Sequence, residues 1–347
     1  GGQTREAMGI FAENQTLKFI NGKEGTPIKI TAKESGWNNG MPTGIGVGKD
    51  GTVIIEHDVS IEHLGLAQRA CGISAWDSGG KVFLKGLTIK EGAIETKDKR
   101  GSTAYGISAQ GDKTLIEIEK PVDISLKGYG IYSHNRATVR ISGGKIITDT
   151  DIEKLHKALY ASGGYTQGAV SVISVNMNRE NTAAGNHDVE ILGDIATESN
   201  SGSNSNGIVF LGMNTEKSAW RGVTYYKEFK NGRIKEGDVN LWLGNGATWT
   251  NESTSLLDDS SSSSVNRWNG SRIAALHGGS DAGHAGVVVQ KDAHPITVKD
   301  YSGYTTVIYE HDTAVPAEPA AGLSMIGGDF KRRPQGAGSH FVQITRA

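Results

Sequence analysis

The chain has 347 residues, which is enough for one elongated array or for two ordinary domains. Its 48 glycines and only 7 prolines favour many tight turns between short strands over a disordered linker. The formal net charge is −2, which excludes a strong electrostatic attraction to nucleic acid or to an anionic membrane. Cys71 is the single cysteine, so an internal disulfide is excluded, and both a cytosolic and an exported location stay open.

The first residues lack the basic start and the apolar core of a secretion signal. No run of about 18 apolar residues occurs, so the sequence predicts no membrane-spanning helix. The end of the chain also lacks the alternating segments of an outer-membrane barrel. If the protein is exported, we expect the signal and the anchor to lie outside this sequence.

Four copies of one pattern follow each other between residues 44 and 147. Each copy starts with Gly-Ile, at Gly44, Gly72, Gly106 and Gly130. These starts are 28, 34 and 24 residues apart (44 to 72, 72 to 106, 106 to 130). Two more short apolar segments follow each start. Such a three-strand unit cannot bury its own apolar side, but stacked units can.

Weaker copies continue to the end of the chain. Their strands are predicted at residues 158–161, 170–173, 189–191, 207–211, 239–243, 273–276, 286–289, 296–298, 305–309 and 341–344. Residues 151–159 differ, because Ile152, Leu155 and Leu159 have helical spacing, which predicts a short corner helix running into the next strand. The predicted fold is all-β: one right-handed parallel β-helix over residues 1–347, with loop insertions at its corners.

The most specific stretch is residues 241–250, which read Leu-Trp-Leu-Gly-Asn-Gly-Ala-Thr-Trp-Thr. It resembles the L-x-L-G-x-x-A-x-W coil near the C-terminal end of pertactin-like autotransporter passengers. Residues 296–309 and the turn at 327–330 look similar to the parts that follow in that family. The resemblance implies a Gram-negative bacterial cell-surface location, with a tether to the outer membrane through a barrel outside this sequence. It says little about the ligand, since one fold hosts many functions.

Residues 76–80, Trp-Asp-Ser-Gly-Gly, look like the Gly-Asp-Ser-Gly-Gly loop of serine proteases. Only 75 residues precede them, and a two-barrel protease needs its His and Asp partners well upstream. A turn between two strands is therefore the favoured interpretation.

Many parallel β-helices cleave polysaccharides, and residues 233–235 match the Arg-Ile-Lys of pectin-cleaving hydrolases. Glycoside hydrolysis needs two carboxylates on one face, but Asp258 and Asp259 come after this motif, in a serine tract. We therefore predict no enzyme and no catalytic residue; a carbohydrate-active enzyme on the same fold is the alternative.

The histidines lack an i, i+4 pair and a thiol partner, so we expect no metal and no cofactor. They are His277, His284, His294 and His311.

Two segments are predicted insertions: an aromatic and basic one at residues 213–238 and a Ser-rich loop at 251–271. Aromatic and arginine side chains dominate many binding interfaces, so the first insertion is the predicted ligand-binding segment. Its predicted ligand-binding residues are Trp220, Arg221, Tyr225, Tyr226 and Phe229. The other interpretation is that these rings fold back over a coil as a small cluster.

The predicted function is that of a surface-exposed adhesin. It would mediate cell attachment, aggregation or biofilm formation by non-catalytic binding. The expected partners are a host or bacterial surface receptor, a glycan or a second copy of the chain, with no nucleic acid and no membrane insertion of this segment. A structural stalk is a third alternative.

Overall fold

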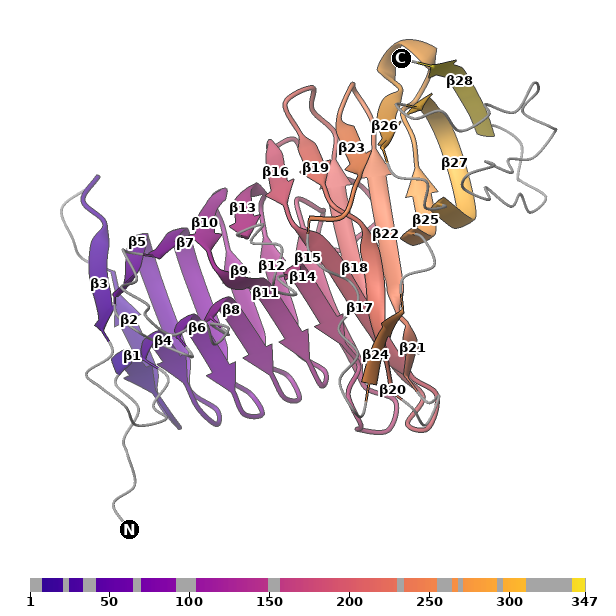
Figure 1. Ribbon diagram of the computed structural model, residues 1–347. Helices are drawn as coiled ribbons and strands as arrows, with labels where there is room; N and C mark the ends of the chain where they lie inside the picture. The colour runs from indigo at the N-terminus through magenta and orange to yellow at the C-terminus, as the bar shows by residue number, and fades with distance from the viewer. Residues whose placement is uncertain are drawn as a thin grey trace, which may run out of the picture.

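The structure is a computed structural model that describes residues 8–20, 25–33, 42–64, 70–91, 104–148, 157–229, 234–254, 264–267, 271–291, 296–309 and 339–346. Within these ranges most residues lie in strands, and the helical structure is the 3-10 turn η1 (Ala282–His284). No helix in these ranges is long and apolar enough to cross a bilayer. The strands form an elongated stack from the indigo N-terminal end to the yellow C-terminal end (Figure 1).

Strands of successive layers pair in parallel on three sides of the stack. The first side contains β1 (Met8–Ala12), β4 (Thr43–Val47), β6 (Cys71–Trp76), β8 (Ala104–Gln110), β11 (Gly128–His134), β14 (Lys157–Ser162), β17 (Asp194–Asn200) and the start of β20 (Thr224–Phe229). The predicted all-β, mostly parallel arrangement is confirmed.

The second side contains β2 (Thr16–Phe19), the first halves of β5 (Thr52–Leu64) and β7 (Lys81–Glu91), β9 (Leu115–Ile118), β12 (Thr138–Ile141), β15 (Val170–Val175), β18 (Ser205–Met213), β22 (Asp238–Leu243), β25 (Ser271–His277) and the start of β27 (Ile296–Tyr309).

The third side contains β3 (Ile28–Lys33), the second halves of β5 and β7, β10 (Val122–Leu126), β13 (Gly144–Thr148), β16 (Val189–Leu192), β19 (Ala219–Arg221), β23 (Thr248–Asn251), β26 (Gly286–Gln290), the end of β27 and β28 (Ser339–Arg346).

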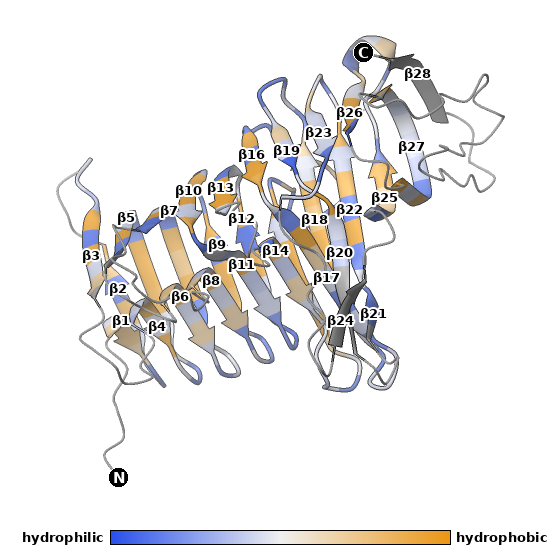
Figure 2. Cartoon of the chain, viewed as in Figure 1, coloured by the Kyte–Doolittle hydropathy of each residue, from blue (hydrophilic) through white to orange (hydrophobic). Residues whose placement is uncertain are grey.

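The hydrophobic core runs inside the stack, because parallel strands in register place equivalent residues above one another. The isoleucines of the Gly-Ile starts pair directly from layer to layer and are fully buried: Ile45, Ile73, Ile107 and Ile131. Similar columns from the other two sides join one continuous cluster. Figure 2 shows apolar residues concentrated in the strands and polar residues at the turns.

Glycine starts each repeat because the backbone of the next layer passes very close. A Cβ on Gly44, Gly72 or Gly106 would lie 2.7, 2.6 or 2.5 Å from the carbonyl oxygen of the glycine one layer further on. These separations are too short for a Cβ, so a larger residue would push the layers apart. The Gly-Ile repeat is therefore a requirement of layer stacking.

Replacing Gly106 with alanine should lower the free energy of unfolding by about 1–3 kcal/mol, because the added methyl group overpacks the contact between two layers. Chemical denaturation followed by circular dichroism measures this change. Gly283→Ala is the control, since its Cβ would lie 3.3 Å from an exposed Asp281 side-chain oxygen and would meet no backbone of a neighbouring layer. Equal effects of the two substitutions would contradict this explanation.

Part of the chain leaves the parallel stack at the lower right of Figure 1. The outer half of β20 pairs antiparallel with β24 (Ser264–Arg267), and β21 (Ile234–Glu236) pairs antiparallel with the end of β17. Residues 213–238 thus contain three whole strands where the sequence analysis expects a loop insertion. Of the predicted Ser-rich loop at 251–271, residues 255–263 and 268–270 lie outside the described residues.

The predicted corner helix falls largely outside the described residues, because 151–156 are not among them. The expectation that this segment runs into a strand is confirmed by β14, which begins at Lys157.

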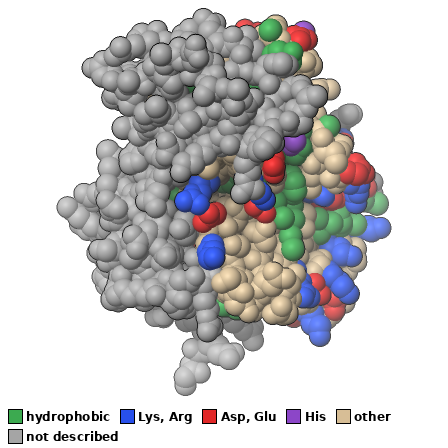
Figure 3. All heavy atoms as spheres, turned by 90° about the vertical axis from the view of Figure 1, so that its right-hand side faces the viewer, with side chains coloured by type: hydrophobic (Ala, Val, Ile, Leu, Met, Phe, Trp, Pro, Cys, Tyr) green, Lys and Arg blue, Asp and Glu red, His purple; other side chains and the backbone are tan. Residues whose placement is uncertain are grey.

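Charged side chains of opposite sign lie next to each other on the surface. Ion pairs join Lys145 to Glu190 at 3.4 Å and Arg221 to Glu252 at 2.8 Å. Figure 3, which faces the C-terminal end, also shows basic and acidic side chains interspersed. This mixture of both signs agrees with the small net charge of the sequence.

Candidate functional site

Trp220 is a core residue, and its prediction as a surface-loop contact is wrong. It lies on β19 with 1% of its surface exposed and stacks on Trp249 of β23, with ring centroids 4.8 Å apart. The two indole N–H groups donate to the carbonyl oxygens of Gly193 and Gly222, each at 3.0 Å. The ring occupies an inward position of a short strand. The aromatic composition of the segment is the same whether its rings lie on such a strand or on a surface loop, so composition alone did not reveal this position.

The other predicted binding residues are scattered. Tyr225 is 4% exposed and packs on Ala196 and Val223, as the alternative interpretation of a small cluster expects. Arg221 is exposed and paired with Glu252. Tyr226 and Phe229 lie in the half of β20 that pairs with β24, and their side chains are outside the described residues. For Arg221, Tyr226 and Phe229, a role in ligand binding stays a prediction.

The structure does not describe most of the residues weighed for catalysis. Arg233, Asp258 and Asp259 lie outside it. Residues 77–80 form the predicted turn after β6. Within the described ranges, no group of three or more His, Cys, Asp or Glu could hold a metal ion.

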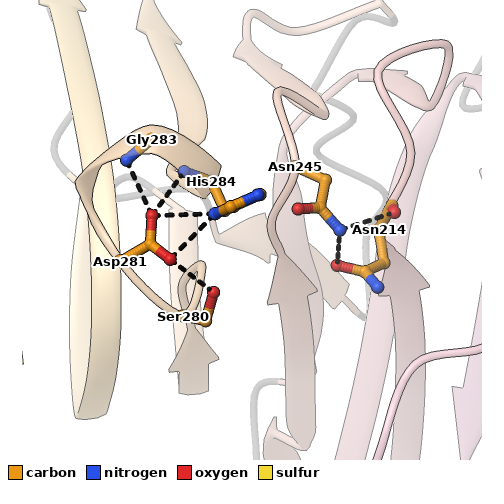
Figure 4. Close-up of polar contacts among 6 residues, drawn as sticks. All are labelled: Asn214, Asn245, Ser280, Asp281, Gly283 and His284. Carbon is orange, nitrogen blue, oxygen red and sulfur yellow. Dashed lines mark hydrogen bonds and ion pairs between the residues drawn. The ribbon is translucent and has the colours of Figure 1, made fainter.

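His284 and Asp281 form an exposed pair in the corner turn that carries η1 (Figure 4). The His284 Nδ1 lies 2.8 Å from both carboxylate oxygens of Asp281, and this hydrogen bond lowers the pKa of Asp281. The same carboxylate accepts the backbone N–H groups of Gly283 and His284. In neighbouring corners the Asn245 amide donates to the Asn214 side chain at 3.0 Å. These hydrogen bonds stabilise the corner turns.

The outward surface of the first side carries a cluster of aromatic and ionisable side chains, which we call the tyrosine face. Its members are Tyr105, Tyr129, Tyr132, His134, Lys157, Tyr160 and Glu198. They come from β8, β11, β14 and β17, whose parallel register aligns them in columns along the stack. Alternation along the strands turns Tyr132, Tyr160 and Glu198 outward next to the inward Ile131, Leu159 and Thr197, whereas Tyr105 and Tyr129 precede the Gly-Ile step, where the alternation of buried and half-buried residues is interrupted.

The rings of the tyrosine face contact each other within and between layers. The centroids of Tyr105 and Tyr129 are 4.9 Å apart, as are those of Tyr132 and Tyr160. Tyr132 also stacks on His134 at 5.7 Å. All of these rings are half-buried, so part of each stays open to solvent.

Lys157 is enclosed by three tyrosine rings. Its Nζ lies 3.9 Å from the ring centroid of Tyr160, 5.3 Å from that of Tyr129 and 5.4 Å from that of Tyr225. Such rings attract an ammonium group electrostatically and replace part of its lost hydration. Burial nevertheless lowers the pKa of Lys157 to about 8, against an opposing contribution from Glu198.

Glu198 is 5% exposed, and its Oε2 accepts the Tyr160 hydroxyl at 2.6 Å. Burial, followed by the Glu198 charge, raises the pKa of Tyr160. Within the part of the chain that the structure describes, Glu198 Oε1, the Tyr225 hydroxyl and His134 Nδ1 have no hydrogen-bond partner. All three atoms are buried out of contact with solvent, and buried polar atoms without a partner are uncommon in proteins.

A signal in the sequence could have revealed this cluster. Tyr105 and Tyr129 directly precede the third and fourth Gly-Ile starts, and Tyr132 and Tyr160 occupy the same register position in successive layers. Aligning the repeats on their outward positions would have placed the tyrosines in columns. The sequence analysis aligned only the apolar, inward positions.

The chain matches no family model, no curated protein and no solved structure. The tyrosine face therefore rests on the structure alone, and the resemblance to pertactin-like passengers stays a prediction.

Proposed function

We propose that this chain is a right-handed parallel β-helix segment of a bacterial autotransporter passenger, and that it works at the cell surface as a non-catalytic, adhesin-type binding module. The parallel three-sided stack supports the β-helix. Leu241, Leu243 and Trp249 of the passenger-like motif are all buried inward positions, as expected for a coil of that family.

The observation that carries the binding function is the tyrosine face, with its half-buried rings in columns along the stack. A purely structural stalk needs no such cluster on its outer surface, because its strands already pair above and below. A glycosidase would need a pair of carboxylates, whereas the seven side chains of this face include one, Glu198.

The test measures binding of the purified chain to cultured epithelial cells and to Gram-negative bacterial cells by flow cytometry. Tyr132→Ser should lower binding by about tenfold or more, the loss of one aromatic contact at an interface. Serine fits this position, because Ser108 occupies it one layer earlier.

The matched control is Phe210→Ser, which removes a half-buried aromatic side chain from the second side of the stack. It should leave binding unchanged. Failure of the wild-type chain to bind either cell type would overturn the proposal, as would full binding by Tyr132→Ser.

A further inference from the structure

We infer that the N-terminal end of the stack docks against the same end of a second copy of this chain, so that two stacks join end to end about a twofold axis. The docking surface is the first coil, formed by β1, β2 and β3 at the indigo end of Figure 1. The tyrosine face begins further along the stack, at β8. The inference is therefore independent of the binding function proposed above.

The first coil is an ordinary layer of the stack and not a cap. Its β1 contains Gly9-Ile10, and a Cβ on Gly9 would lie 2.8 Å from the Gly44 carbonyl oxygen, as at the later Gly-Ile starts. A solenoid that ends in solvent needs a terminal repeat with a polar outer face. The described inward positions of the first coil are apolar, so this coil does not meet that requirement.

The hydrophobic core is open at this end. Each strand of the first coil has inward residues that pack against the core and yet are only partly buried: Ile10, Leu17, Phe19 and Ile28. Their register partners in the second layer are at most 1% exposed: Ile45, Val53, Ile55 and Val59. The two sets occupy equivalent positions, so the difference arises because no layer covers the first coil.

The outer backbone edge of the first coil is also unpaired. β1 pairs with β4, and β2 and β3 pair with β5, while within the described ranges no strand pairs with their other edges. A free strand edge is a template for another chain, and proteins often block it with proline or with inward-pointing charges. These three strands contain no proline, and the exposed Lys18 and Lys29 alternate with the inward residues. These lysines therefore surround the open core without covering it.

A second copy matches this surface better than a single peptide strand does. The open edge has three sides, and an added peptide strand would pair with one of them. A twofold axis perpendicular to the stack brings two identical ends together and makes the facing strands antiparallel. Every side of the coil has a partly buried apolar residue, so apolar residues face each other across the axis.

The area of the end is sufficient for a weak dimer. The three strands are 5, 4 and 6 residues long. At about 3.3 Å per residue and a sheet thickness of about 10 Å, they present about 500 Å². Two ends together would bury about 1,000 Å², which is the lower limit for a specific interface.

Sedimentation velocity and small-angle X-ray scattering of the whole 347-residue chain test the inference. A weak interface requires concentrations from about 1 to about 200 μM. We expect the mass of two chains at the upper end of this range, in a particle about twice as long as the monomer. A single chain at every concentration overturns the inference. A dimer with the length of a monomer also overturns it, because that shape indicates side-by-side association.

Variants locate the interface. Leu17→Lys and Ile28→Lys place a charge at an inward position of β2 and of β3. Each should weaken dimerisation by about a hundredfold or more, because every dimer would bury two unpaired ammonium groups. Ile54→Lys is the matched control, since Ile54 is a half-buried outward residue of the second layer, in register with Lys18. It should leave dimerisation unchanged. Wild-type affinity in a folded Leu17→Lys or Ile28→Lys variant overturns the inference.

Hydrogen exchange of the unmodified chain decides the matter if circular dichroism shows that neither end variant folds. Backbone amides of β1, β2 and β3 should exchange more slowly in the concentrated sample than in the dilute one. Amides of β12, in the middle of the stack, should exchange equally in both. Equal exchange of β1, β2 and β3 at the two concentrations overturns the inference.

Discussion

Replacing Trp249 with alanine should destabilise the layers around it by about 3–5 kcal/mol, the largest effect of a single substitution that we expect. The indole is fully buried, stacks on Trp220 at an interplanar angle of 2°, and donates to the Gly222 carbonyl. Its removal leaves a large cavity and an unpaired buried carbonyl group. In a stack, each layer is stabilised by its neighbours, so the loss should be concentrated in β16, β19, β23 and β26.

Hydrogen exchange measured by mass spectrometry resolves this local effect, and Trp242→Ala is the matched control. Trp242 is half-buried on the outer surface, where it stacks on His277 at 4.4 Å. We expect its removal to change exchange much less than Trp249→Ala. Equal exchange in the two variants would show that Trp249 is not a core residue.

The stability of the protein should rise between about pH 8 and about pH 9.5 because of Lys157. Its folded pKa of about 8 is below its ordinary value of 10.5. In this range the unfolded chain holds a proton that the folded chain has released, so the free energy of unfolding increases with pH. The rise is about 2 kcal/mol over this window, at about 1.4 kcal/mol per pH unit.

The tyrosine and histidine side chains around Lys157 affect different pH ranges. Burial raises the pKa of Tyr160 and Tyr225, and the stability that this provides is lost above about pH 10. Burial lowers the pKa of His134, which affects stability only below about pH 6.5. These contributions lie mainly outside the window from about pH 8 to about pH 9.5, and a variant without the ammonium separates the contribution of Lys157 from that of any other group that titrates within it.

Urea denaturation at several pH values measures the rise, and Lys157→Met removes the ammonium while keeping the length of the side chain. The rise should be absent in this variant. A rise of the same size in wild type and variant would exclude Lys157 as its source.

The all-β, mostly parallel arrangement of strands was predicted from the inward positions of the sequence. The Gly-Ile starts have two physical requirements that the sequence displays directly. One is glycine, because a Cβ there would lie 2.5–2.7 Å from a carbonyl oxygen of the next layer, and the other is isoleucine in the core column. Each copy repeats both, so the strands at 44–47, 72–75 and 106–109 could be located from the pattern. The same pattern holds no information about contacts between outward side chains.

The candidate site was missed because it depends on register across layers. Lys157 and Glu198 are 41 positions apart in sequence (157 to 198), and only the stacking of β14 on β17 brings them to one surface. Trp220 was misassigned for a related reason. Its strand has three residues, too few to show an alternating pattern, and the neighbouring β20 leaves the stack.

Footprinting of tyrosines on the cell-bound chain tests the central claim most directly. Free and cell-bound protein are labelled with hydroxyl radicals, and the modified residues are quantified by mass spectrometry. If the tyrosine face is the binding surface, labelling of Tyr129 and Tyr132 decreases on binding, while Tyr165, which is 72% exposed on a corner turn, is labelled equally in both states. Unchanged labelling of Tyr129 and Tyr132, with protection of Tyr226 and Phe229 instead, would contradict this account and return binding to the segment that the sequence first indicated.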